Sequence, residues 1–219
     1  FEGTFNGNGH KIDGMLLDVD FITTKNTYGN QNYSAGYDHY FGLFAKTKGA
    51  TITDVELSDA RVINNDGNIN EHVHIGTLIT QVDGTTVREC SVQQTDTIST
   101  DRANAVAAVA AFICHTDGAA STIENNFVSG SIYAHPDSTN MTAPISGFIS
   151  TLGHGSTMEH CYSLVDVTAQ SVAGLADTIN GATLEHSYYA GTLTRTKDGT
   201  PWGAILANAT NANVKHCYY

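Results

Sequence analysis

The sequence contains no long hydrophobic run and little positive charge. No uninterrupted apolar stretch approaches the roughly 18 residues that span a bilayer as a helix. Lysine and arginine number 10 against 22 aspartates and glutamates, so the 219-residue chain carries a formal net charge of −12. Nucleic acids and anionic membrane surfaces attract basic proteins. We therefore expect no nucleic-acid partner and no membrane insertion.

An initiator methionine and a signal peptide are also missing, and the chain opens at Phe1 within a repeating pattern. We therefore expect a processed or excised segment of a longer protein. Neither end has the polar cap that a stacked array of repeats requires. The partners expected at the ends are other segments of the same protein or further copies joined end to end.

What the sequence does contain is a short motif that recurs along the whole chain, with its clearest copy at residues 184–189. We name the apolar residue that opens each copy position n. Successive openings are 26 to 40 residues apart, and periods of this length are typical of solenoids. The openings are Ile12, Ile52, Val87, Ile123, Met158, Leu184 and Val214.

The spacing inside the motif predicts two short strands that meet at a bend. Positions n and n+3 are apolar or small and n+5 is often apolar, which a flat strand of period two cannot place on one side. The bend is expected at n+2, where most copies have residue types that tolerate a left-handed backbone. Glu89 is the exception, and in the first copy the bend is expected at Asp13 or Gly14. The favourable residues are Asp54, Asn125, His160, His186 and His216.

Such corners are typical of a parallel β-helix, and the copies predict an all-β chain of about seven coils. A helical repeat is disfavoured, because β-branched and aromatic residues dominate and no 3.6-residue apolar stripe persists. The repeats cover residues 1–219 without a linker, which favours one domain. The insertions fall at one place in the repeat, so we expect loops on one side of the body. They comprise residues 64–71, 101–104, 135–143 and 194–201.

Only four cysteines occur, and their positions argue against disulfides. Cys90, Cys161 and Cys217 share position n+3 of alternate copies. Coils about 4.8 Å apart would separate these thiols by about 9 to 10 Å, which is beyond disulfide reach. We therefore expect free and buried cysteines, with Cys114 in another column and without an evident partner. No metal or redox role is assigned to them, and no cofactor is expected.

One row of aromatic residues is the candidate ligand-binding surface. Position n+4 is occupied by Phe127, Tyr162, Tyr188 and Tyr218 on the last four copies. Such a row can bind the apolar face of a sugar, or it can stabilise a sheet through ring contacts of about 0.2 to 1 kcal/mol each. We favour the structural alternative for the row. The loop residue Trp202 completes the candidate ligand-binding set.

A histidine column and several loop charges are weaker candidates. His160, His186 and His216 are expected about 5 Å apart, a spacing that suggests metal binding or pH sensing. A straight column does not supply convergent ligands, so no metal site is predicted. No catalytic residue is predicted either, because nothing in the sequence brings the loop charges together. These charges are Asp101, Arg102, His135, Asp137, Lys197 and Asp198.

The glycine-led segments resemble a known repeat. Residues 42–44, 147–149 and 174–176, with motifs such as those at 158–162 and 184–188 behind them, resemble the GLUG repeats of bacterial surface proteins. Residues 5–12 are similar to the segment that often precedes those repeats, including in the β-helical region of IgA-cleaving metallopeptidases. The resemblance implies a right-handed β-helix, secreted or on a bacterial surface, without catalytic residues. The His-Glu-x-x-His zinc motif is absent, so peptidase activity is not expected.

These observations predict a non-catalytic structural or binding module of a secreted or cell-surface protein, which acts as a stalk, adhesin or fibre element. Carbohydrate and a host surface are its candidate ligands. The alternative is a carbohydrate-active β-helix enzyme, a polysaccharide hydrolase or lyase, or the accessory domain of one. A convergent acid/base group on the loop side would distinguish the two functions.

Overall fold

The computed structural model of the chain describes residues 1–18, 38–64, 72–93, 98–100, 106–134 and 143–219. Every regular element within these ranges is a β-strand. None of the described residues belongs to a helix long and apolar enough to cross a membrane. The prediction of an all-β chain is confirmed.

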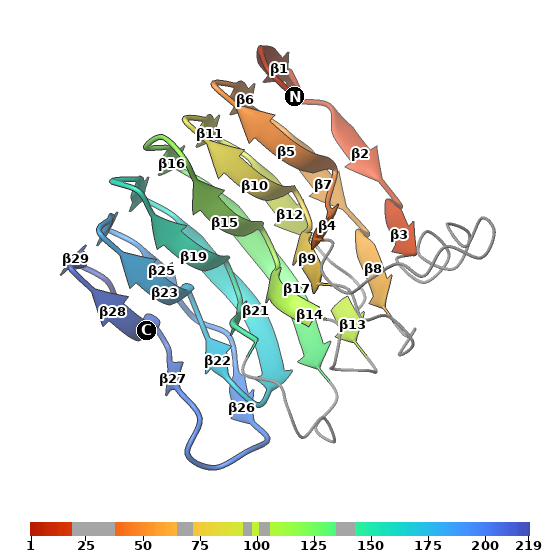
Figure 1. Cartoon of the computed structure of the whole chain (residues 1–219). Helices are drawn as coiled ribbons and strands as arrows, with labels where there is room; N and C mark the ends of the chain where they lie inside the picture. Colours follow the sequence, from red (N-terminus) through yellow and green to blue (C-terminus); the bar gives the residue numbers. More distant parts are fainter. Residues whose placement is uncertain (19–37, 65–71, 94–97, 101–105, 135–142) are drawn as a thin grey trace, which may run out of the picture.

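The strands form four parallel sheets that run along the length of the stack, with the N-terminal and C-terminal coils at opposite ends (Figure 1). Sheet A consists of β1 (Thr4–Asn6), β6 (Thr51–Thr53), β11 (Thr86–Arg88), β16 (Thr122–Glu124), β20 (Thr157–Glu159), β24 (Thr183–Glu185) and β29 (Asn213–Lys215). Sheet B consists of β2 (Lys11–Asp13), β3 (Leu16–Asp18), β7 (Glu56–Ser58), β8 (Arg61–Asn64), β12 (Ser91–Gln93), β13 (Ile98–Thr100), β17 (Phe127–Ala134), β21 (Tyr162–Ala169), β25 (Tyr188–Tyr189) and β26 (Leu193–Arg195).

The other two sheets complete each coil. Sheet C consists of β4 (Asp38–Phe41), β9 (His72–Gly76), β14 (Val106–Ala110), β18 (Ile145–Ser146), β22 (Val172–Ala173) and β27 (Trp202–Gly203). Sheet D consists of β5 (Phe44–Lys48), β10 (Ile79–Asp83), β15 (Ile113–Asp117), β19 (Ile149–Gly153), β23 (Ala176–Asn180) and β28 (Leu206–Thr210). A coil therefore passes through sheets C, D, A and B in turn before the next coil begins.

The repeat motif forms the central column of sheet A. Ile52 pairs with Val87, Val87 pairs with Ile123, and the same register continues through Met158 and Leu184 to Val214. The first five of these side chains are fully buried. Stacking of equivalent residues in parallel register is what a parallel β-helix requires, and the seven strands of sheet A match the predicted number of coils. The right hand of the coil stays a prediction.

The first copy of the motif is misaligned in the sequence prediction. Phe5, and not Ile12, pairs with Ile52 and opens the first coil. Ile12 pairs with Leu57, which is position n+5 of the second coil. Seven positions separate Phe5 from Ile12, against five from Ile52 to Leu57. The longer segment includes a turn at Asn8 and Gly9, which have φ angles of 53° and 70°. A motif search does not detect such an insertion, because Ile12 is itself followed by residues that suit a left-handed corner, Asp13 and Gly14.

The predicted left-handed corner at n+2 is confirmed in the other six coils. The φ angle is 55° at Asp54, 54° at Asn125 and 48° at His186, with similar values at His160 and His216. Glu89, the expected exception, has the same conformation with φ 55°. Hydrogen bonds between coils fix this backbone, since Glu89 N–H donates to the carbonyl of Glu124 at 3.3 Å. The stacked neighbours thus override the weak preference of glutamate.

Glycine is required where sheet C turns into sheet D. A Cβ atom on Gly42 would lie 2.2 Å from the carbonyl oxygen of Gly76 in the next coil. A Cβ atom on Gly174 would lie 2.1 Å from that of Ala204. Neither distance is possible between real atoms, so the glycines at these two positions permit the close approach of consecutive coils.

Two members of the predicted cysteine column lie in the core, whereas the third, Cys217, was expected to be buried and is only partly buried on the last coil. Cys90 and Cys161 are 2% and 1% exposed, and all four cysteines are free, as expected. Asn126 occupies the same column between them and is fully buried. Its Oδ1 accepts a hydrogen bond from Cys90 N–H at 2.9 Å, and its Nδ2 donates to the Val87 carbonyl at 3.0 Å. The column therefore combines small thiols with one buried amide whose polar groups are both satisfied.

The four insertions connect the same two sheets. The strands on either side of them are β8 and β9, β13 and β14, β17 and β18, and β26 and β27. Each pair runs from sheet B to sheet C. The described strands that flank the insertions thus meet at the same corner of the coil, as the prediction of loops on one side requires.

Candidate functional site

The predicted aromatic row exists as a column of rings on sheet B. Phe127 pairs with Tyr162, Tyr162 pairs with Tyr188, and Tyr188 forms an isolated parallel bridge with Tyr218. The ring centroids of Phe127 and Tyr162 are 4.4 Å apart, and those of Tyr162 and Tyr188 are 5.0 Å apart with an interplanar angle of 5°. The prediction that these four side chains form one row is therefore confirmed.

Stacking limits what this row can bind. Because the rings lie face to face along the stack, the faces between Phe127 and Tyr188 are covered by neighbouring rings. Sugar recognition by aromatic residues uses an open ring face, whereas stacked rings present edges and phenol hydroxyls. Exposure rises to 42% at Tyr188 and 68% at Tyr218. This geometry favours the structural role of the row over a sugar platform along its length.

Trp202 does not lie in the row. It belongs to β27 in sheet C, where it pairs with Val172, and it is 61% exposed. Together with Tyr219 it borders a hollow of about 540 Å³ on the last coil. The predicted ligand-binding residues thus form a row on sheet B and a separate aromatic group at this hollow.

The three histidines of the left-handed corner form a stacked column. The ring centroids are 5.2 Å apart for His160 and His186 and 4.9 Å apart for His186 and His216. The carboxylates of Glu159 and Glu185 lie near the imidazole of His186, with donor atoms within 4.8 Å of one another. The rings are parallel within 9° for the first pair. The second pair is inclined by 27°, and the column as a whole agrees with the predicted spacing of about 5 Å.

The loop charges contribute one ion pair to the described part of the chain. Arg195 Nη2 lies 3.2 Å from Asp198 Oδ1, and the Asp198 side chain is fully exposed. Asp101, Arg102, His135 and Asp137 lie outside the described residues. The ion pair is therefore a solvated surface contact of small energetic value.

A column of buried polar residues lies at the corner between sheets C and D. The second residue of each inner strand of sheet D is a cysteine or a polar residue, and these four residues are at most 3% exposed. Thr80 Oγ1 donates to the Phe41 carbonyl at 2.7 Å, and Ser150 Oγ donates to the Pro144 carbonyl at 3.2 Å. Since the acceptors belong to or border sheet C, the column is turned toward that sheet. Its members are Thr80, Cys114, Ser150 and Asp177.

Asp177 is the acidic member of this corner column. Its carboxylate accepts hydrogen bonds from Ser171 at 3.4 Å, Thr178 at 3.0 Å and Asn208 at 3.4 Å. Burial raises the pKa of Asp177, and the three hydrogen bonds oppose this effect. Because three donors surround this carboxylate, its hydrogen-bonding capacity is satisfied within the structure, which indicates a structural role.

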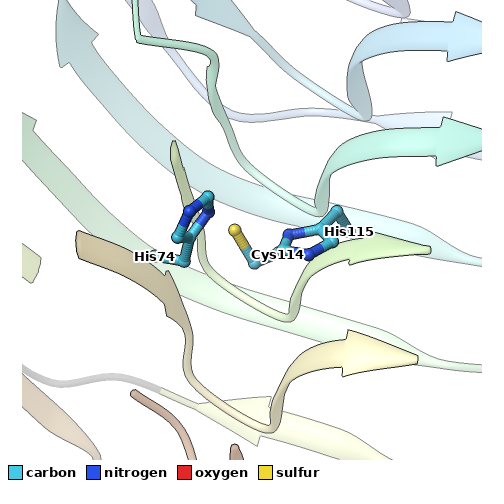
Figure 2. Close-up of side chains that lie close together, drawn as sticks. All are labelled: His74, Cys114 and His115. Atoms are coloured by element: carbon cyan, nitrogen blue, oxygen red, sulfur yellow. The ribbon is translucent and has the colours of Figure 1, made fainter. Parts of the chain in front are cut away.

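Cys114 lies between two histidines in the same corner (Figure 2). His74 projects from β9 in sheet C, and His115 follows Cys114 on β15 in sheet D. The Cys114 Sγ and one nitrogen of each imidazole all lie within 4.8 Å of one another. Cys114 is fully buried and both histidines are partly buried. Three groups that ligate metals thus converge from two sheets.

Polar and aromatic groups surround this cluster. The ring of Tyr40 is stacked on His74 with centroids 5.0 Å apart and an interplanar angle of 9°. Asp38 Oδ1 lies 3.5 Å from His74 Nε2. Lys46 Nζ lies 3.8 Å above the Tyr40 ring. These contacts orient the His74 ring within the corner.

The protonation states of the cluster follow from its burial. Burial lowers the pKa of His115 to about 4, with a further lowering from His74, so that the imidazole is neutral at pH 7. Burial also raises the pKa of the Cys114 thiol far above its ordinary value. In the absence of an ion the corner therefore contains a neutral imidazole beside an uncharged thiol.

The sequence prediction missed this cluster. It aligned only positions n to n+5 of each copy, which form parts of sheets A and B. Cys114 lies outside this motif and was therefore predicted to have no partner. Residues 74 and 115 are about one coil apart in sequence, and the adjacent pair Cys114-His115 follows the turn into sheet D. An alignment of the sheet C and sheet D segments, in addition to the motif, would have placed them together.

The comparisons with known proteins give no family for this chain. A scan against protein-family models found no match, and searches of the curated proteins and of the solved structures found none either. The resemblance to GLUG repeats therefore stays a prediction from the residues quoted for it.

Proposed function

We propose that this chain is a non-catalytic structural and binding module of a secreted or cell-surface protein, used as a stalk, adhesin or fibre element. The unbroken parallel register of sheet A, from β1 to β29, supports this proposal. Each coil adds about 4.8 Å to the stack. Such a body is a stiff spacer that can hold an attached partner at a fixed distance from its anchor.

The surface composition is consistent with this role. The net charge of −12 favours solubility and opposes binding to nucleic acid or anionic lipid. The phenol edges of Tyr188 and Tyr218 form the exposed end of the aromatic row. Carbohydrate and a host surface are the ligands that we propose for this edge and for the exposed ring of Trp202.

Surface labelling of the source cells tests the location. An antibody against residues 1–219 should label intact cells or the culture medium. Signal that appears only after cell lysis would contradict a surface or secreted module.

Binding is tested by replacing the exposed tyrosines with the residue found at the same place in another coil. Ser91 occupies this row position in β12, so the matched variant is Tyr188→Ser with Tyr218→Ser. Adhesion to immobilised glycans or host cells should fall in this variant and in Trp202→Ser. Unchanged adhesion in both variants would remove these aromatic groups from the proposed binding surface.

A carbohydrate-active enzyme is the second candidate, and one observation favours it. Glu159 and Glu185 place two carboxylates beside His186, within the short separation that retaining glycosidases use. The same position carries Glu124 in the preceding coil, so stacking of a repeated residue also accounts for the pair. Release of reducing ends from acidic and neutral polysaccharides, lost in Glu159→Gln and Glu185→Gln, would establish the enzyme.

A further inference from the structure

We propose that His74, Cys114 and His115 form a binding site for a divalent transition-metal ion of the zinc class. The site lies in the corner between sheets C and D (Figure 2), whereas the aromatic row lies on sheet B and the histidine column follows the strands of sheet A. It goes beyond the structural module proposed above and does not depend on that function.

The donor set determines the class of ion. Two imidazole nitrogens and one thiolate sulfur match the ligands that Zn²⁺, Co²⁺ and Cu²⁺ prefer, whereas Mg²⁺ and Ca²⁺ require oxygen ligands. Three protein ligands leave a fourth tetrahedral position for water or another small ligand. The site is therefore of the open type, in which the ion is not fully enclosed by protein ligands.

The geometry requires only small movements. A tetrahedral ion with bonds of about 2.0 to 2.3 Å separates its ligand atoms by about 3.3 to 3.6 Å. The three donor atoms lie within 4.8 Å of one another without an ion. Rotation of the two imidazole side chains can close this difference, while the strand backbones remain in their sheets. Cys114 is fixed by its complete burial and lies between the two rings.

The surroundings of His74 favour one ring nitrogen as the ligand. The Asp38 carboxylate, 3.5 Å from Nε2, stabilises a proton on that nitrogen and leaves the lone pair on Nδ1. A carboxylate behind a histidine ligand is the usual arrangement around protein-bound zinc. Stacking on Tyr40 limits rotation of the same ring. Asp38 and Tyr40 are thus expected to position His74 without touching the ion.

In metal binding, the ion takes the place of the proton on the Cys114 thiol. A divalent ion replaces the proton of the Cys114 thiol, forms one metal–sulfur bond and two metal–nitrogen bonds, and releases one proton to solvent. Each imidazole binds the ion through the lone pair of an unprotonated ring nitrogen. The ion also compensates for the burial of the thiolate, which would be unfavourable in its absence.

Cobalt titration of the purified 219-residue chain tests the site directly. One equivalent of Co²⁺ should produce d–d absorption of tetrahedral intensity together with a thiolate-to-metal charge-transfer band in the near ultraviolet. Addition of Zn²⁺ should abolish both signals by displacement. Competition with a chromophoric chelator gives the affinity for Zn²⁺.

The repeat supplies matched variants that the fold tolerates. Serine stands at the Cys114 position in the next coil (Ser150), glutamine at the His115 position in the preceding coil (Gln81), and alanine opposite His74 (Ala108). The test variants are therefore Cys114→Ser, His115→Gln and His74→Ala. Cys161→Ser, in the core column, and His186→Asn, in the histidine column, are the controls.

The expected results separate this site from its alternatives. Cys114→Ser should lose the charge-transfer band, and each test variant should weaken Zn²⁺ binding by about tenfold or more, the range found even for residues behind the ligands. Both controls should bind as the parent chain does, and circular dichroism should show all variants folded. Loss of binding in His186→Asn, a charge-transfer band that persists in Cys114→Ser, or no cobalt signal in the parent chain would overturn the proposal.

Discussion

Nδ1 of His216 lies 3.2 Å from Nε2 of His186, and the two rings are stacked with centroids 4.9 Å apart. Both residues have φ angles close to 50°, so the contact joins two left-handed corners of consecutive coils. The backbone conformation, and not the imidazole alone, selects the residue types found at this position. Aspartate, glutamate and asparagine occupy it in earlier coils.

His186→Val is therefore expected to destabilise the chain by about 1 to 2 kcal/mol, because a β-branched residue is strained in this conformation. His186→Asn should be nearly neutral, since Asn125 has the same corner with φ 54°. Urea unfolding of the two variants measures the difference. Equal losses in both would indicate a role specific to histidine.

The buried amide of Asn126 gives a second prediction. Asn126→Leu leaves the Cys90 N–H without its acceptor and should lower the free energy of unfolding by about 2 kcal/mol or more. Asn126→Ser should cost less, because Ser187 Oγ accepts the equivalent N–H of Cys161 at 3.1 Å in a later coil. Chemical denaturation of both variants checks this order, and a serine variant as unstable as the leucine variant would contradict it.

The thiols should differ in reactivity between the folded and unfolded chain. Cys90, Cys114 and Cys161 are buried, and burial raises the pKa of Cys90 to about 11, so these thiols should resist alkylation in the folded chain. Cys217 is partly exposed and should react first. Intact mass should show one adduct in the folded state and four under non-reducing denaturing conditions. Fewer than four after denaturation would reveal a disulfide.

The sequence predicted the features that depend on one coil and its repeat. The apolar column from Ile52 to Leu184, the corner at His186 and the ring row through Tyr162 all follow from residue type and spacing. The pairing of Phe5 with the second coil could not be predicted. Two extra residues lengthen the first coil, and the residues after Ile12 resemble another copy of the motif. Contacts between sheets C and D could not be predicted either, because the six-residue motif covers only parts of sheets A and B.

The candidate metal site belongs to this second group. His74 and Cys114 lie on different strands of different sheets, and only the bend between sheets C and D brings them together. The backbones approach closely at this bend, since a Cβ atom on Gly76 would lie 2.5 Å from the backbone nitrogen of Cys114. A single sequence shows that glycine is present, but it does not show the direction in which the neighbouring side chains then converge.

The raised pKa of Asp177 leads us to expect that the stability of the folded chain depends on pH. Burial raises its pKa in the folded chain, so the folded state holds this proton more tightly than the unfolded state. The contribution of Asp177 is therefore most favourable below its ordinary pKa of 3.8 and declines as pH rises through the higher folded value. Asp177→Ser, matched to Ser150 in the preceding coil, removes the titrating group.

Urea unfolding of the parent chain and of Asp177→Ser at pH 4 and pH 7 measures this effect. The stability of the parent relative to the variant should be greater at pH 4 than at pH 7. A difference that is constant, or that grows toward pH 7, would show that the hydrogen bonds from Ser171, Thr178 and Asn208 outweigh burial.

The continuous stack is the central claim, and distances between spin labels along sheet A test it most directly. In a background with all four cysteines replaced by serine, labels are placed in pairs at Thr51 and Thr183, Thr4 and Thr183, and Thr4 and Asn213. These pairs are separated by four, five and six strand steps in sheet A. The backbone separations should be about 19, 24 and 29 Å, a rise of about 4.8 Å for each added coil. Distances by pulsed electron paramagnetic resonance that increase by this step would support the stack, and distances that fail to increase with the number of coils would contradict it.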